Sequence, residues 1–294
     1  LLGLTLTSRD GADKEARIPM AGVPVRTVDT YVARAIQAGR TVTLCDQVED
    51  PKEAKGVVKR EVVRTITPGT IMEAELLEEA SNNYLAALHI SEQGGGLAFV
   101  DVTTGEFLVA EVDPREWHVV ADELTRMAPV EVLVPETDDT ALTDRLRRQF
   151  DAVCFTPRPG DDFDAALGCE RLMDAFELST LKGVQLDDAP TAAACAGAVL
   201  QYVRQTQRDS APRLQLPRRY SPAGYVVLDG NTQRNLELVE SLAEKSKRGT
   251  LLGVLDRTLT SMGGRKLRSW ILHPLLGVGA IRERLGAVEQ FHES

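Results

Sequence analysis

The stretch Leu97-Ala98-Phe99-Val100-Asp101-Val102-Thr103-Thr104-Gly105-Glu106-Phe107 decides how the middle of this chain folds. An apolar run ends at an acidic residue, a tight turn follows at Thr104-Gly105, and a second run begins at Glu106. This order predicts antiparallel strands over residues 96–102 and 106–111. Residues 84–90 form a third apolar run immediately upstream, so we expect three consecutive antiparallel strands.

Helix-like and strand-like patterns alternate after these three strands. The periodicity predicts helices and strands in the order helix 114–127, strand 131–134, helix 142–150, strand 152–155 and helix 163–178. This succession is expected of a layered α/β domain. Gly94-Gly95-Gly96, between the first two strands, is interpreted as a flexible hairpin tip and not as a phosphate cradle.

The residues before this domain also indicate a mixed α/β block. We expect strands at 1–7, 41–45 and 57–66, the last interrupted by Lys59-Arg60-Glu61, and a buried Cys45. Thr27 or Asp29 is suited to cap a helix that ends at Gly39, and residues 67–70 form a closing turn. The segment 18–24 is too rich in Pro and Gly for a regular element.

From Thr191 onward the pattern predicts helices. They cover residues 191–207, a segment after Asp229 with Leu236, Val239 and Leu242 on one face, and residues 251–257, 262–272 and 280–291. The expected fold class is therefore α/β followed by all-α. Its domains are predicted at 1–73, 74–188 and 189–294.

The charge is distributed unevenly along the 294 residues. The net charge of −10 would by itself argue against nucleic acid. Residues 1–73, however, carry 11 basic and 10 acidic side chains, residues 74–188 carry 8 and 25, and residues 189–294 carry 15 and 9. The blocks have net charges of +1, −17 and +6, so only the middle one is expected to avoid phosphate.

Several classes of site are not encoded. No apolar run reaches about 18 residues, so no membrane span is expected. The four cysteines are far apart, which disfavours zinc and disulfides and indicates a reducing compartment. There is no GxxxxGK[ST], GxGxxG after a strand, or GxSxG motif, so no catalytic residue, cofactor site or metal site is predicted.

Basic residues of the first block are the candidate DNA-binding residues. If the strand ending near Arg9 pairs with the strand containing Lys59 and Arg60, their ends form a small cationic edge suited to phosphate. Met20 has a thioether able to pack on sugar or base. The alternative to DNA contact is that the basic residues form an ordinary solvated face and that Met20 fills a gap in the core. One side of the helix predicted at 262–272 carries Arg265, Lys266 and Arg268. An ordinary solvated helix surface explains these residues at least as well as a phosphate-binding surface does.

Asp101 is the one enzyme-like feature. A metal-binding aspartate occupies a strand of this kind in ribonuclease H-like nucleases, and two-metal chemistry needs several converging carboxylates. No second carboxylate is clearly placed beside it. We therefore favour a solvated or capping aspartate on an edge of the sheet.

Five motifs, taken together, resemble the MutS family of DNA mismatch repair proteins. Ile18-Pro19-Met20-Ala21-Gly22-Val23-Pro24 with Asp29-Thr30-Tyr31, Asp46-Gln47-Val48-Glu49-Asp50-Pro51, and residues 55–70 resemble its mismatch-recognition domain. Residues 99–107 resemble its connector domain, and residues 229–238 resemble the opening of its helical core or lever domain. Residues 255–265 and 273–275 continue that last match. The resemblance covers essentially the whole chain in the same order.

The resemblance implies a protein that binds mismatched double-stranded DNA and couples recognition to an ATPase. The family's Phe-x-Glu motif does not occur in residues 1–73, and its clamp domain and P-loop are not found, so an internal piece of a longer, cytoplasmic and nucleoid-associated bacterial protein is expected. Arg9 and Arg60, and less strongly Met20 and Lys59, match DNA-contact positions. The family also implies a ribonuclease H-like connector, a MutL-type partner, a homodimer, and ATP with Mg²⁺ in the full-length parent.

Two other functions remain as hypotheses. The first is a metal-dependent ribonuclease H-like nuclease centred on Asp101. The second is a non-enzymatic module whose acidic middle block binds a basic partner without any role on DNA.

Overall fold

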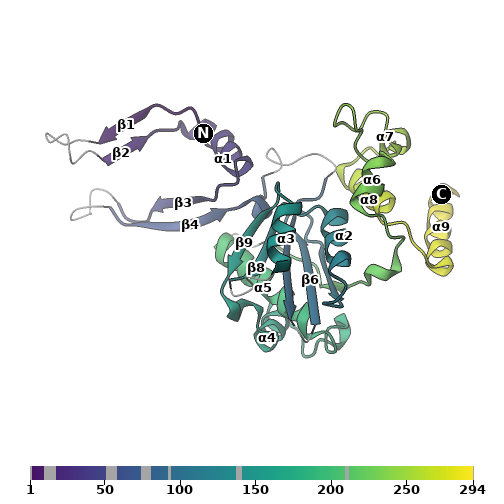
Figure 1. Ribbon diagram of the computed structural model, residues 1–294. Helices are drawn as coiled ribbons and strands as arrows, with labels where there is room; N and C mark the ends of the chain where they lie inside the picture. The colour runs from purple at the N-terminus through teal and green to yellow at the C-terminus, as the bar shows by residue number, and fades with distance from the viewer. Residues whose placement is uncertain are drawn as a thin grey trace.

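The computed structural model describes residues 2–9, 18–50, 58–73, 81–91, 94–136, 141–208 and 212–293. Figure 1 shows two hairpins that extend away from a central sheet covered by helices, with a group of further helices on another side of that sheet. Mixed α/β structure is therefore followed by helices, as the sequence predicts. Among the described residues no helix is both long and apolar enough to cross a membrane.

The first block consists of two separate two-stranded sheets and one helix. Its elements are β1 (Leu6–Arg9), β2 (Ile18–Ala21), the 3-10 turn η2 (Val25–Thr27), α1 (Val28–Gln37), β3 (Val42–Gln47), β4 (Arg60–Ile66) and the 3-10 turn η3 (Pro68–Thr70). β1 pairs with β2 and β3 pairs with β4, both antiparallel. The core of this block is small. It consists of apolar contacts between α1 and the base of the β3–β4 hairpin, through Val32, Ile36 and Ile66.

Three predictions for this block are wrong. The segment 18–24 contains a strand, because each strand of a two-stranded sheet is an edge strand, where proline is tolerated. Arg60 and Glu61 lie inside β4 and do not interrupt it, since an exposed hairpin can carry charged side chains. Cys45 is exposed, because no helix of the described residues covers that part of β3, where the ladder also shifts register after Leu44.

The middle block is a six-stranded sheet. Its elements are β5 (Tyr84–Ser91), β6 (Gly94–Asp101), β7 (Phe107–Val112), α2 (Trp117–Met127), β8 (Glu131–Pro135), α3 (Ala141–Gln149), β9 (Cys154–Arg158), the 3-10 turn η5 (Gly160–Phe163), α4 (Ala165–Phe176), the 3-10 turn η6 (Lys182–Val184), α5 (Pro190–Gln207) and β10 (Arg218–Arg219). The strand order is β10-β7-β6-β5-β8-β9, with β5, β6 and β7 antiparallel. β8 joins β5 in parallel, and the three predicted antiparallel strands are confirmed.

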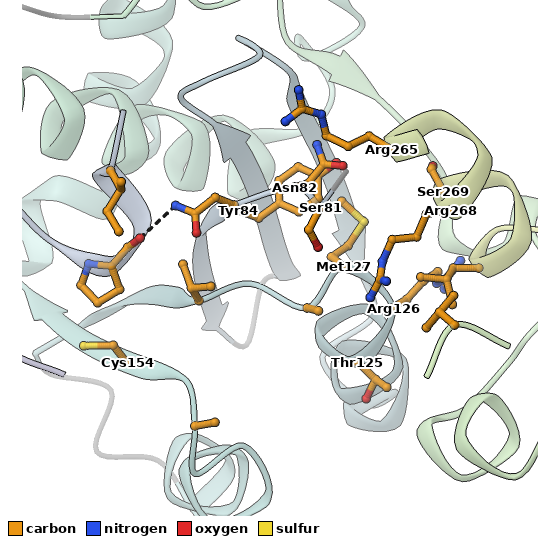
Figure 2. A pocket seen from close by; sticks show the side chains of 18 of the residues that line it. Ser81, Asn82, Tyr84, Thr125, Arg126, Met127, Cys154, Arg265, Arg268 and Ser269 are labelled. Carbon is orange, nitrogen blue, oxygen red and sulfur yellow. Dashed lines mark hydrogen bonds between the residues drawn. The ribbon is translucent and has the colours of Figure 1, made fainter. Parts of the chain in front are cut away.

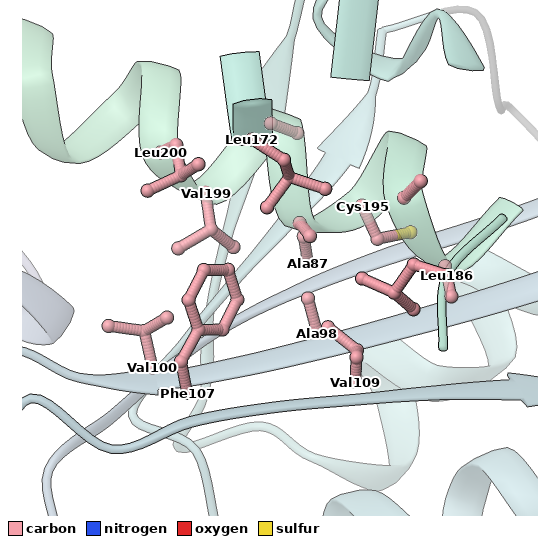
Figure 3. Packing of buried hydrophobic residues seen from close by; sticks show 14 of the residues in the cluster. Ala87, Ala98, Val100, Phe107, Val109, Leu172, Leu186, Cys195, Val199 and Leu200 are labelled. Carbon is pink, nitrogen blue, oxygen red and sulfur yellow. The ribbon is translucent and has the colours of Figure 1, made fainter. Parts of the chain in front are cut away.

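Helices cover both faces of this sheet. Ala87, Val100, Phe107 and Val109 pack under α4 and α5 on one face, as Figure 3 shows. On the other face Phe99 and Leu97 pack with Leu124 of α2 and Leu146 of α3. The sheet is thus the middle layer of three.

Helix α5 belongs to this block in space, although its first residue lies just after the predicted boundary at residue 188. Fourteen of its 18 residues are buried, and it packs on β5, β6, β7 and α4. β10, which follows it, pairs in parallel with β7. This packing supports a boundary after β10 in place of one before α5.

The remaining elements of the described residues are the 3-10 turn η8 (Pro222–Gly224) and four helices: α6 (Gly230–Asn235), α7 (Leu251–Leu255), α8 (Ser261–Leu272) and α9 (Val278–Glu293). The side chains of Asp229, Thr250 and Thr260 cap α6, α7 and α8. Helix α6 ends before Leu236, Val239 and Leu242, contrary to the prediction. Glu237 adopts a left-handed conformation there, and its carbonyl and that of Leu238 accept bonds from the first residues of α7.

The glycines at the start of β6 lie in the strand and do not form a flexible tip. A Cβ atom on Gly96 would stand 2.2 Å from the carbonyl oxygen of Thr191, at the start of α5. The absence of a side chain therefore lets the helix backbone reach the sheet.

Replacing Gly96 by Ala tests this close approach. The clash is with backbone, which cannot move aside cheaply, so we expect the free energy of unfolding to fall by about 3 kcal/mol. Urea unfolding followed by circular dichroism measures it. Gly183→Ala is the matched control, since nothing lies within 4 Å of a Cβ there. An equal effect of the two substitutions would contradict the packing described.

Candidate nucleic-acid interface

The exposed end of the β3–β4 hairpin carries a small charged cluster. Arg60 opens β4 opposite Gln47, and Lys59 directly precedes it. Lys59 Nζ lies 2.6 Å from Glu61 Oε1, with both side chains exposed, and the contact holds the pKa of Glu61 below its ordinary value. The Lys59 amide donates to Glu49 Oε1 at 2.5 Å. Lys59 is therefore already paired with a carboxylate.

Arg60 has a different environment. Its side chain is exposed, and Nη1 reaches the carbonyl oxygen of Val58 at 3.5 Å. Among the described residues no carboxylate forms an ion pair with it. Its guanidinium can thus approach a phosphate without first breaking a salt bridge.

The β1–β2 hairpin and its neighbours contribute apolar surface. Met20 is 44% exposed in β2, which excludes the alternative that it fills a gap in the core. Its carbonyl accepts a bond of 3.1 Å from Thr7 Oγ1 on β1. Leu6, Val25 and Val48 are also exposed in this block, at 73%, 88% and 47%. Sequence reasoning missed these three, because no motif or periodic pattern distinguishes an exposed apolar residue from a buried one at such positions.

The strand pairing expected for Arg9 is wrong. Arg9 ends β1, which pairs with β2, whereas Arg60 begins β4, which pairs with β3. The two residues therefore do not share a sheet edge. Both hairpins nevertheless extend away from the six-stranded sheet, as Figure 1 shows.

The turn after β4 fixes the hairpin to the sheet domain. Thr67 and Thr70 form a capping box, and the amide of Gly69 donates to Glu131 Oε2 at 2.9 Å. Glu131 is 1% exposed, and its Oε1 accepts bonds of 2.7 Å from both Tyr202 and Thr156. Burial and this carboxylate raise the pKa of Tyr202, so the phenol stays protonated and donates.

A second set of contacts holds the base of β4. Arg64 Nε donates to Gln207 Oε1 at 2.8 Å, and Gln207 Nε2 donates to the carbonyl of Thr70 at 3.0 Å. Arg64 also pairs with Glu73. Burial opposes ionisation of Glu73, but the Arg64 guanidinium and the backbone amides of Met72 and Glu73 together outweigh it and keep the pKa of Glu73 below its ordinary value. The bond from Asn83 Nδ2 to the carbonyl of Pro68, 2.9 Å long, completes the attachment.

Asp101 is a capping residue, as favoured, but it is neither solvated nor at a sheet edge. It is fully buried at the end of the interior strand β6. Oδ1 accepts from the amide and hydroxyl of Thr103 and the amide of Thr104, and Oδ2 from Asn82 Nδ2 and the amide of Asn83, at 2.6–3.4 Å.

These five donors occupy the roughly four lone-pair directions of the Asp101 carboxylate. No oxygen is left directed toward a metal ion, which removes the ligand on which the nuclease hypothesis depends. Among the described residues there is also no group of three His, Cys, Asp or Glu side chains that could hold a metal ion.

Comparison with known families matches three consecutive parts of the chain. MutS domain I matches residues 1–75, MutS domain II residues 83–215 and MutS domain III residues 231–294. The chain belongs to the MutS family. The end of the domain II match agrees with the packing of α5 on the sheet.

Curated relatives agree over the whole chain. The DNA mismatch repair protein MutS of Pelotomaculum thermopropionicum is 42% identical over 293 residues, 98% of this chain and 33% of that protein. Its namesakes in Symbiobacterium thermophilum and Desulfosudis oleivorans are 41% and 42% identical over 290 and 295 residues. The chain spans about a third of the length of these relatives.

Replacing Glu131 by Gln tests the attachment of the hairpin. The –NH2 of glutamine replaces one carboxylate oxygen and so faces either the Gly69 amide or the two hydroxyls, and the negative charge that accepts all three bonds is lost. We therefore expect a loss of about 2–3 kcal/mol in unfolding free energy. Chemical denaturation measures the loss. The exposed Glu170→Gln is the control, with an expected change within about 0.5 kcal/mol. Equal stability of both variants would show that the carboxylate does not hold the turn.

Proposed function

We propose that this chain contacts mismatched duplex DNA through its two hairpins, as part of a DNA mismatch repair protein. The observation that carries the proposal is the exposed Arg60 at the free end of an anchored hairpin, within the part matched by MutS domain I. The names of the curated relatives support the substrate. Arg60 contacts backbone phosphate, which positions the duplex without reading its sequence.

The other candidate residues are proposed to contribute to DNA binding to different extents. Lys59 contributes less than Arg60, because Glu61 already neutralises its charge. Met20 contributes apolar contact with sugar or base. Arg9 is assigned to phosphate on the resemblance alone, since its side chain lies outside the described residues.

The six-stranded domain is proposed as a ribonuclease H-like connector that docks a protein partner of the MutL type. Three antiparallel strands followed by parallel β8 and β9 support that topology. Its acidic side chains gather on α4 and the neighbouring turns, where the exposed carboxylates are Asp161, Asp164, Glu170, Asp174, Glu177 and Asp187. Figure 1 places α4 at the end of the sheet away from the hairpins, so this surface is kept off DNA by distance and by charge.

The remaining family functions are proposed to act outside the region described. The chain spans a third of its relatives' length, which supports an ATPase with ATP and Mg²⁺, and a homodimer contact, elsewhere in a longer protein. A cytoplasmic, nucleoid-associated location is proposed on the same basis. We assign no catalytic residue to this chain.

Replacing Arg60 by Ala tests the proposed DNA contact. Loss of one phosphate contact is expected to weaken heteroduplex binding roughly uniformly across sequences and to reduce the salt dependence by about one counterion. Fluorescence anisotropy at several salt concentrations, with a mismatched and a matched duplex, measures both quantities.

Arg40→Ala provides the matched control. Arg40 is an exposed arginine of the same block, but it lies two residues before the first residue of β3, at the base of the hairpin. We expect it to leave affinity and salt slope unchanged. Unaltered binding in the Arg60 variant, or equal weakening by both substitutions, would refute the assignment of Arg60.

A further inference from the structure

A cavity of about 610 Å³ lies where the first block, the sheet domain and the last helices meet. Its walls come from the end of α1, the turn after β4, the start of β5, the end of α2, and α8. Figure 2 shows Arg265 and Arg268 extending from α8 into this space, toward β5 and the end of α2. None of the DNA-contact residues assigned above lines it.

Three arginines line the cavity: Arg126 of α2 joins Arg265 and Arg268 of α8. Among the described residues that form the walls there is no Asp or Glu. His273 also lines the cavity, but burial lowers its pKa to about 4, so it is neutral at pH 7. Arginines that share a poorly solvated space repel one another unless an anion lies among them.

Two of these guanidinium groups have donors without acceptors. The side chain of Arg126 is 4% exposed; Nη2 pairs with Glu123, which does not line the cavity, while Nη1 is buried and bonds to nothing among the described residues. Arg265 Nε is likewise buried without a partner there. Burial lowers the pKa of Arg126, as expected for a cation whose charge is incompletely compensated.

We propose that this cavity binds a small phosphorylated ligand of about mononucleotide size, with its phosphate held by Arg126, Arg265 and Arg268. Guanidinium groups bind phosphate oxygens through paired N–H donors, which supplies the missing acceptors. The volume exceeds that of a lone phosphate and falls in the range of small-molecule sites. Ile36, Tyr84 and Leu272 supply apolar wall for the organic part of the ligand.

The site joins three parts of the chain that are far apart in sequence. A ligand there contacts α2 of the sheet domain and α8 of the helical block at once, and the end of α1 forms a further wall. Occupancy is therefore expected to stabilise one arrangement of these parts relative to others.

Isothermal titration calorimetry of the 294-residue chain tests the proposal with inorganic phosphate, pyrophosphate and AMP as probes. We expect saturable binding, with AMP tighter than phosphate because it fills more of the cavity. Arg265→Gln and Arg268→Gln are each expected to weaken AMP binding at least tenfold. Lys266→Gln is the matched control, since Lys266 is exposed on the same helix and does not line the cavity.

Three outcomes would overturn the proposal. They are no saturable binding of any probe to the unaltered chain, equal weakening by Lys266→Gln and Arg265→Gln, and binding of duplex DNA alone that depends on Arg265. Circular dichroism melting of each variant without ligand checks folding. If Arg265→Gln does not fold, Arg268→Gln decides the same question.

Discussion

The buried carboxylate of Glu131 is the contact on which the arrangement of this molecule depends. Its two oxygens accept hydrogen bonds from Gly69, Tyr202 and Thr156, which belong to the turn after β4, to α5 and to β9. A buried charge is tolerated only where such donors compensate the loss of water. Removing any one of the three donors would leave the buried charge less compensated, and the one carboxylate links the hairpin, the central helix and the sheet.

This anchor also fixes the distance between the proposed DNA-contact residue Arg60 and the sheet domain. β4 runs directly from Arg60 to the anchored turn, seven residues or about 20 Å of extended chain. A displacement of the exposed end of the hairpin is thus expected to act on the anchored turn, which lies beside the cavity lined by Arg126, Arg265 and Arg268. Helix α4 packs with α5 on one face of the sheet and makes none of the hydrogen bonds to Glu131. The proposed DNA contact, the proposed docking of a partner and the proposed ligand cavity accordingly lie on three different surfaces.

The parts of the fold that depend on local sequence could be predicted, and those that depend on distant contacts could not. Residues 84–112 follow from apolar runs and one tight turn, and a metal-binding role for Asp101 could be disfavoured because no second carboxylate is clearly placed beside it. The partner of the Arg9 strand, the exposure of Cys45 and the length of α6 are decided by segments far away in sequence. The position of α5 did leave a signal: a helix that is Ala-rich on every side is buried on every side. Arg60 and Met20 could be proposed as site residues from motifs. That Arg265 and Arg268 line a cavity while Lys266 faces solvent depends on where α8 packs, which the sequence does not show.

Hydrogen–deuterium exchange of the Glu131→Gln variant tests the central claim most directly, because it reports where the structure loosens and not only how much stability is lost. If the carboxylate anchors the hairpin, amides of residues 60–70 exchange much faster in the variant, while the interior strands β6 and β7 keep their protection. Unchanged exchange of residues 60–70, or an equal increase across the whole sheet, would show that Glu131 does not form the connection between the hairpin and the domain.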